Sequence, residues 1–211
     1  MTVTVEEIGK YLGKTTEDPM GRPAGKLVGL SADIKDEVTA VQVAQSNGEV
    51  SQYIVSLVRI IDGRVVLLQS WRVDAEDLKR EHTIIKRRSQ ALDLLLKDGD
   101  IDQAEYHLQR SNYEELGKEI DKKREALLDT LEEVEAKIEQ QIRDLQAALT
   151  NNKMLYTASE IDEPTYNAVT ESIRAGLEIA RKERKDLDNT REYLQAIDAV
   201  EAPKPIPTPP V

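Results

Sequence analysis

Residues 127–149 read LLDTLEEVEAKIEQQIRDLQAAL. Apolar side chains return in this stretch at steps of four and three residues, which is the spacing of a coiled-coil seam along one face of an α-helix. The remaining positions are mostly charged, and no proline interrupts the chain between Asp102 and Leu149. We therefore expect one long helix here, with an apolar stripe that packs against another helix.

A second stripe with the same stepping follows Glu163-Pro164, where proline is acceptable in the first turn of a helix. In the first stripe, Gln141 supplies one polar position and Ala148 continues the heptad pattern. We expect the two stripes to form a self-assembly seam that contacts other copies of the chain. Its predicted residues are Leu127, Leu131, Val134, Ile138, Leu145, Tyr166, Val169, Ile173, Leu187 and Leu194.

A short motif occurs twice at an offset of 60 residues. Gly99-Asp100-Ile101-Asp102 precedes Tyr106 by the same distance at which Ser159-Glu160-Ile161-Asp162 precedes Tyr166. In each copy the aspartate can cap a new helix while the isoleucine before it forms a hydrophobic staple. Leu78, Ile85 and Leu92 predict another helix before the first copy, so the chain should double back at least twice.

The first 70 residues or so have a different pattern, with short β-prone runs between turn signals. Asn47-Gly48 and Asp62-Gly63 are strong hairpin signals, because both favour positive φ at little cost. The predicted strands are Ala24–Leu30, Glu37–Ala44, Tyr53–Ile61 and Arg64–Trp71. The sequence thus predicts an α+β chain with a small barrel-like β domain at 1–73, a helical coiled-coil or hairpin region at 74–200, and a proline-rich extended tail at 201–211.

Composition limits the function classes. The formal charge of −11 argues against a general affinity for nucleic acid, since phosphate binding is driven mainly by cationic side chains. The chain has no cysteine, which excludes disulfides and thiolate metal sites. No apolar run has the length of a signal peptide or of a membrane span, so we expect a soluble cytoplasmic protein whose membrane contacts are peripheral.

Catalytic signals are weak. His82 and His107 stand alone on predicted helices, without a second ligand at metal-binding spacing, and we expect both on helix surfaces. No phosphate-binding glycine loop or nucleophile motif is present. The sequence therefore predicts a protein without catalytic residues, metal or cofactor.

One basic cluster stands out in this acidic chain. It consists of Lys79, Arg80, Lys86, Arg87 and Arg88, at the start of the first long helix. Each cation near a membrane surface adds roughly 1 kcal/mol to binding, so the cluster is a candidate contact for anionic lipid or, with weaker support, for DNA. The alternative is that these cations pair with carboxylates on neighbouring helices.

The C-terminal tail is the second candidate binding element. Its prolines stand at alternate positions, so an extended chain lacks amide hydrogens along one edge only and can add to a sheet once. Docking as a polyproline II helix in a groove and a solvated tail without a partner are the alternatives. The candidate residues are Pro203, Pro205, Ile206, Pro207 and Val211.

Three segments carry a resemblance to known proteins. Tyr11-Leu12-Gly13-Lys14, Gly21–Leu30 and the Asp62–Leu68 hairpin resemble a PRC-barrel domain. A PRC barrel followed directly by long charged helices and a short proline-rich terminus is similar to the archaeal CdvA family of cell-division proteins.

The resemblance implies a non-enzymatic cytoplasmic scaffold that polymerises at the division site, on the inner face of the membrane. It also implies association with membrane and with DNA, and recruitment of an ESCRT-III-like partner through the winged-helix domain of that partner. The alternative function is a dimeric PRC-barrel adaptor that tethers another cytoplasmic client, such as a ribosomal or metabolic complex.

Overall fold

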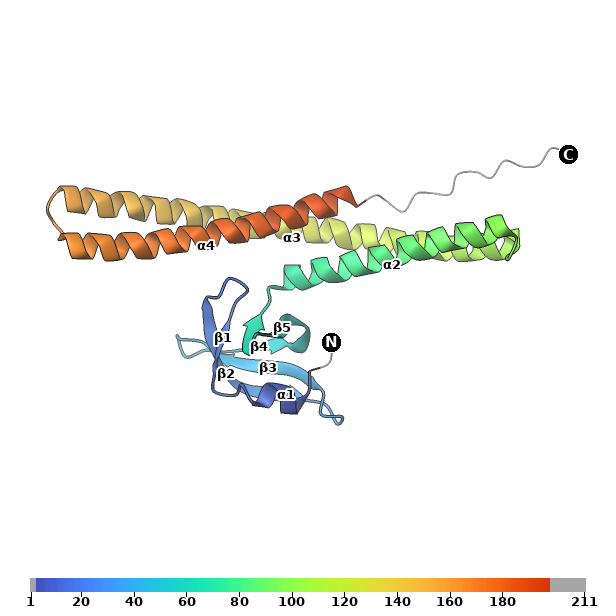
Figure 1. Ribbon diagram of the computed structural model, residues 1–211, viewed down its shortest axis with the longest axis horizontal. Coiled ribbons are helices and arrows are strands. Elements are labelled where there is room, and N and C mark those ends of the chain that lie inside the picture. Colours follow the sequence, from blue (N-terminus) through green and yellow to red (C-terminus); the bar gives the residue numbers. More distant parts are fainter. Residues whose placement is uncertain (1–2, 198–211) are drawn as a thin grey trace. The chain divides into compact units, whose positions relative to one another are not determined.

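The structure, a computed structural model, describes residues 3–197. A small β unit comes first and three long helices follow, which confirms the predicted α+β class (Figure 1). Contacts divide the chain after Val73, into Met1–Val73 and Asp74–Val211. The proline-rich tail lies outside the described residues, so its extended conformation stays a prediction.

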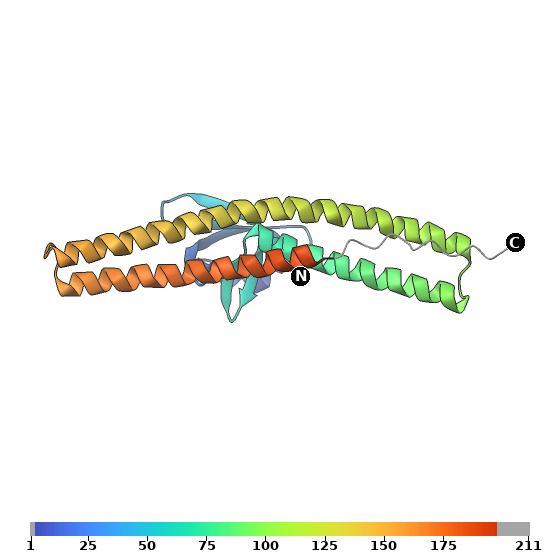
Figure 2. The ribbon, with the colours of Figure 1, turned by 90° about the horizontal axis from the view of Figure 1, so that it is seen from above.

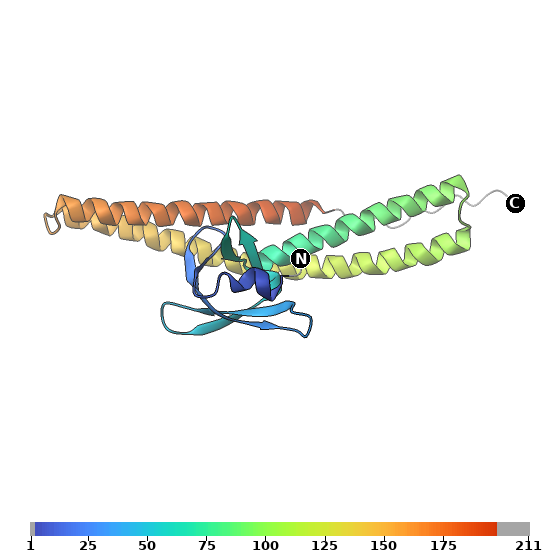
Figure 3. The same ribbon diagram turned by 60° about the horizontal axis from the view of Figure 1, so that its bottom comes forward.

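The β unit is a single six-stranded sheet that is strongly bent (Figure 3). Its order is β4-β3-β2-β1-β6-β5, with β1 and β6 parallel and all other neighbours antiparallel. The strands are β1 (Thr15–Glu17), β2 (Pro23–Ala32), β3 (Val38–Ala44), β4 (Val50–Ile54), β5 (Val58–Ile61) and β6 (Arg64–Leu67). The core is aliphatic and includes Ile8, Leu27, Val41, Val43, Val58 and Val65.

Two predicted strands were wrong. The run Tyr53–Ile61 is interrupted by the 3₁₀ helix η1 (Val55–Leu57), which separates β4 from β5 and sends them to opposite edges of the sheet. The last strand ends at Leu67 rather than at Trp71, which belongs to the following helix. The first helix, α1 (Val5–Gly9), and β1 were not predicted, because elements this short leave almost no periodicity in a sequence.

Backbone geometry explains why Asp62-Gly63 forms the predicted hairpin. Asp62 and Gly63 have φ of 49° and 73°, so both central residues of the β5–β6 turn are left-handed, as a two-residue hairpin of type I′ requires. Gly25 is needed for a different reason, which is the small space between two strands. A Cβ there would lie 2.5 Å from the carbonyl oxygen of Ala44, so the close approach of β2 to β3 needs glycine.

The helical unit is built along one helix, α3 (Gln103–Thr157). Its 55 residues span roughly 80 Å, and α2 (Ser70–Asp98) and α4 (Glu163–Ala196) lie along it one after the other. Figure 2 shows α2 and α4 on the same side of α3, at opposite ends. The helix α3 runs eight residues past the Leu149 end that the sequence suggested, because contacts with α4 override the low helix propensity of the asparagines there.

The repeated motif forms two similar corners. Asp102 and Asp162 cap their helices by accepting the backbone N–H of Glu105 at 2.8 Å and of Thr165 at 3.0 Å, which confirms the predicted caps. The preceding helix ends in the same way in both corners, with Gly99 and Ser159 left-handed at φ of 78° and 60°. The amide of the next residue then bonds the carbonyl five residues back, as in a Schellman motif.

Candidate functional site

Helices α3 and α4 pack on each other along the predicted seam. Leu131, Leu187 and Leu194 are fully buried, and Leu127 and Ile138 are 5% and 4% exposed. These contacts lie within one chain. A contact with another copy through the same residues therefore stays a prediction, and it would require the α3–α4 hairpin to open.

The contact line departs from a strict heptad toward the far end of the hairpin. Val134, Leu145, Tyr166 and Ile173 are half-buried. Val169 is exposed, and its neighbour Thr170 is buried instead. On α3 the expected positions Gln141 and Ala148 are exposed, while Ile142 and Leu149 are half-buried. An ideal helix drifts by about 20° per heptad, so the side that faces the partner moves to the next residue.

A buried polar contact fixes this end of the hairpin. The Nδ2 amide of Asn152 donates to Thr170 Oγ1 at 3.0 Å and to the carbonyl oxygen of Tyr166 at 3.1 Å. The Tyr166 ring stacks on Tyr156, with centroids 4.5 Å apart. Because a buried amide is satisfied only in one alignment, this contact can set the register of α3 against α4. The sequence analysis did not predict this contact. The available signal for it was Asn152, three residues beyond the helix end suggested at Leu149.

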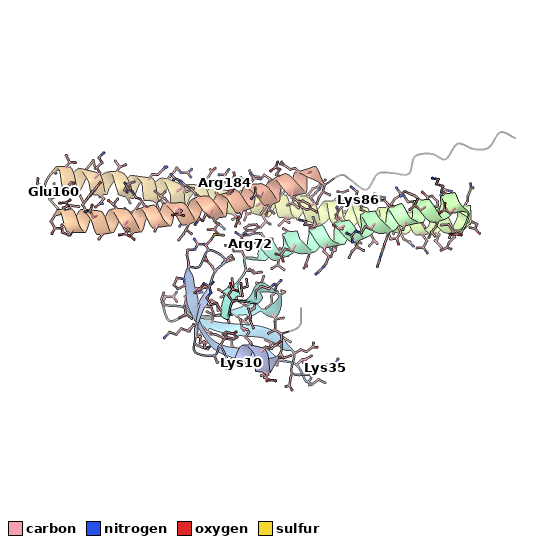
Figure 4. All side chains as sticks on the ribbon, in the orientation of Figure 1. Lys10, Lys35, Arg72, Lys86, Glu160 and Arg184 are labelled. Atoms are coloured by element: carbon pink, nitrogen blue, oxygen red, sulfur yellow. The ribbon has the colours of Figure 1, made fainter. Side chains whose placement is uncertain are left out.

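Ion pairs join the same two helices nearer the middle of α3. Glu135 accepts from Arg184 and Arg191, and Arg184 also reaches Glu139 and lies 3.1 Å from Asp188. Figure 4 marks Arg184 on α4. The hydrogen bond from Arg191, together with the nearby charge of Arg184, holds the pKa of Glu135 below its usual value of 4.5. The spacing of the two arginines, seven residues apart on α4, was the sequence signal for a shared carboxylate.

A second seam joins α2 to the first half of α3. On α2, from Asp74 onward, the buried residues are Leu78, His82, Ile85, Ser89 and Leu92. On α3 they include Tyr106, Arg110 and Ile120. Two polar contacts between the helices fix the pairing: Tyr106 OH donates to Asp93 at 2.8 Å, and Lys123 Nζ lies 2.7 Å from Glu81.

The two histidines differ from each other. His107 is exposed, as expected, but the surface position predicted for His82 was wrong, because only 9% of that side chain is exposed. It lies four residues after Leu78 and three before Ile85, which places it on the buried stripe. No group of His, Asp or Glu within residues 3–197 is arranged to hold a metal ion.

The first turns of α2 meet the last turns of α4 beside the middle of α3. The Lys79 ammonium lies over the Tyr193 ring, 4.7 Å from its centroid. Arg124 of α3 donates to the carbonyl oxygen of Ile197 at 3.2 Å. Between α2 and α3 a hollow of about 400 Å³ remains, with Leu78 and Leu127 among its lining residues and Asp77 and Glu81 beside them.

The structure divides the basic cluster into two parts. Lys79 lies over Tyr193, and Arg80 pairs with Asp77 at 2.7 Å. Lys86, Arg87 and Arg88 are exposed, and none of them makes an ion pair within residues 3–197 (Figure 4 marks Lys86). The predicted pairing with carboxylates on neighbouring helices therefore holds for none of these three in the described chain. We call them the basic belt.

The partner-binding tail, from Pro203 to Val211, lies outside the described residues, and its role stays a prediction. Within the described chain, no helix combines the length and the apolar character needed to cross a bilayer.

Comparison with known proteins decides the family. The profile described as the CdvA-like coiled-coil domain matches residues 70–207, which is more than half of the chain. The chain belongs to the CdvA-like coiled-coil family. The protein "Cell division protein A" of Sulfolobus acidocaldarius is 25% identical over 205 residues, which cover 94% of this chain and 83% of that protein. No solved structure matches the chain.

The CdvA-like match begins at the first residue of α2 and includes all of α3 and α4. The family signal therefore lies in the helical unit, which contains both seams and the basic belt. The similarity to the Sulfolobus protein extends over the β unit as well, since it covers nearly the whole chain.

Proposed function

We propose that this chain is a self-assembling cytoskeletal scaffold of archaeal cell division. In this proposal it acts in the cytoplasm at the division site, associates peripherally with the membrane, and recruits an ESCRT-III-like partner. The observation that carries the proposal is the family match over the whole helical unit. The similarity to a protein named for cell division supports the same role.

The helical unit supports a structural role rather than a catalytic one. Its buried side chains form two seams along α3, and polar groups such as Glu135, Asp102 and Asp162 form ion pairs and helix caps. An elongated set of paired helices provides long exposed faces on which copies can align. The family supports the same non-enzymatic function.

Polymerisation needs contacts outside the closed seam. Leu131, Leu187 and Leu194 have no exposed surface in one chain, so they cannot drive association while the hairpin is closed. The remaining surfaces of the helical unit are the outer faces of its helices, which are mostly charged and also expose apolar side chains such as Leu94 and Leu108. A protomer with two unlike contact surfaces forms an open filament when the rotation between copies does not close a ring.

Negative-stain microscopy of the purified full-length chain tests the scaffold proposal. We expect filaments at high concentration. Discrete dimers would instead favour the adaptor that tethers another client, and a single-copy species would contradict both assembly proposals.

Recruitment is tested separately by removing residues 201–211. The shortened chain should still form filaments but should no longer co-sediment with the winged-helix domain of an ESCRT-III-like protein. Undiminished co-sedimentation would place the recruiting surface elsewhere in the chain.

A further inference from the structure

We infer that the copies of this chain join through opposite charges: the basic belt on α2 of one copy docks on an acidic face of α3 in the next. This contact deepens the proposed polymerisation and rests on it. The acidic face consists of Glu125, Asp129, Glu132 and Glu133.

Arg87, the centre of the basic belt, lies on the side of α2 that faces away from α3, and Lys86 and Arg88 lie nearer the edges of the seam. Each residue advances about 100° around a helix, so Arg87 lies about 200° from the buried Ile85. Lys86 and Arg88 flank it. Arg80 and Leu94 stand seven residues before and after Arg87, on the same outer line, and 57% of the Leu94 side chain is exposed. From Lys79 to Arg88 the helix has five cations and Glu81 as its single carboxylate.

The acidic face lies on the outer side of α3. Asp129 and Glu133 each follow a buried leucine by two residues, Leu127 and Leu131, and so point away from α4. All four carboxylates of the face are exposed, and none of them makes an ion pair within residues 3–197. From Glu125 to Glu135 the chain has five carboxylates and no cation.

The two surfaces match in length and in charge. Arg80 to Arg88 and Glu125 to Glu133 each cover nine residues, and their ends are about 12 Å apart along the helix. Arg80 pairs with Asp77 on its own helix, whereas the three cations of the basic belt and the four carboxylates of the acidic face make no ion pair within residues 3–197. Neighbouring like charges on one helix repel each other, and an oppositely charged partner relieves that repulsion.

The position of the two surfaces makes the contact open-ended. The helices α2 and α4 lie on one side of α3 (Figure 2). The acidic face lies on the other side, because Asp129 and Glu133 each follow a buried leucine of the seam by two residues. When the belt of one copy binds the acidic face of a second, the first copy still has a free acidic face and the second a free belt. Further copies can therefore add at both ends.

Charge reversal tests this contact in the full-length chain. The belt variant carries Lys86→Glu, Arg87→Glu and Arg88→Glu, and the face variant carries Glu125→Lys, Asp129→Lys and Glu133→Lys. The control, Lys10→Glu with Lys35→Glu and Lys153→Glu, reverses three exposed charges elsewhere. Circular dichroism checks that each variant keeps its helices, and centrifugal pelleting with negative-stain microscopy measures the filaments.

We expect each charge-reversed variant alone to lose about tenfold or more of its pelleted fraction, because the contact would bring like charges together. The control should pellet as the unchanged protein does. An equimolar mixture of the belt and face variants should form filaments again, since the reversed belt of one then meets the reversed face of the other. A merely structural effect of the substitutions would not be repaired by mixing.

Other results separate this inference from the proposed function. Filaments of the unchanged protein that persist in either variant, or a mixture that fails to assemble, would overturn the contact while leaving the scaffold intact. The contact between copies would also be overturned if the belt variant kept its filaments and lost only its binding to vesicles of anionic phospholipid. That result would show that the basic belt binds the membrane. Absence of filaments in the unchanged protein would contradict the proposed function itself.

Discussion

At the scale of single residues, the two corners of the helical unit form a natural comparison. Gly99 and Ser159 occupy equivalent left-handed positions, but only Gly99 suits that conformation. A Cβ at Gly99 would meet nothing within 4 Å, so any cost of a side chain there is conformational. The serine corner should therefore store a small strain that the glycine corner lacks.

We predict that Ser159→Gly raises the free energy of unfolding by about 0.5–1 kcal/mol, because glycine adopts positive φ without strain. The matched substitution Gly99→Ala should lower it by about 1–2 kcal/mol. Urea unfolding followed by circular dichroism measures both values. A less stable Ser159→Gly variant would show that the serine hydroxyl makes a contact that outweighs the strain.

The buried amide of Asn152 gives a second prediction. Either Asn152→Leu or Thr170→Val alone should cost about 1–2 kcal/mol, because each leaves a buried polar partner unsatisfied. The double variant should cost clearly less than the sum, since both partners are then apolar. A double-mutant cycle measured by urea unfolding checks this. Strictly additive losses would mean that the two side chains do not act as a pair.

At the scale of elements, α3 is held to α4 by charge as well as by apolar packing. Hydrogen bonding from Arg191 lowers the pKa of Glu135 in the folded chain. A group whose folded pKa is lowered adds stability that is present above its unfolded pKa of about 4.5 and is lost as pH falls through the folded value. The ion pairs of Glu135 should thus stabilise the hairpin at neutral pH and fail in acid.

We predict that Glu135→Gln lowers the free energy of unfolding at pH 7 by about 1–2 kcal/mol. The difference from the unchanged protein should shrink as pH falls below about 4.5, because the carboxylate of the unchanged protein is then protonated too. Urea unfolding at several pH values measures this difference. A deficit that stays constant down to pH 3 would contradict the assignment of the lowered pKa to Glu135.

The long elements could be predicted from the sequence and the short ones could not. Stripes over many turns, such as the one from Leu127 to Leu145, specify a helix repeatedly, and each corner repeats the same cap. By contrast, Tyr53–Ile61 has the composition of a strand throughout, and only the tertiary structure inserts η1 and parts β4 from β5. The local propensity of a segment does not determine which edge of a sheet a strand joins.

The candidate site could also be predicted only in part from the sequence. Periodicity located the seams, but it could not tell whether a stripe packs within one chain or between copies, because both bury the same residues. It also treated His82 as a surface residue, although the stripe through Leu78 and Ile85 passes over it. The polar contacts of Asn152 and Glu135 depend on which residues of α4 lie opposite, and a single helix does not encode that alignment.

At the scale of the helical unit, the helix lengths account for the arrangement. Together α2 and α4 are slightly longer than α3, by about two turns of helix. They therefore run along almost the whole length of α3, and they overlap near its middle, where the Lys79 ammonium lies over the Tyr193 ring. The outer side of α3 remains uncovered, and it is there that Glu125, Asp129 and Glu133 are exposed.

Sedimentation velocity of the purified full-length chain over a range of concentrations tests self-assembly most directly. A scaffold joined by unlike surfaces should show a distribution that shifts continuously to larger species as concentration rises, and it should shift back at high salt, where charged contacts are screened. A sedimentation coefficient that stays that of a single copy at every concentration would contradict the account.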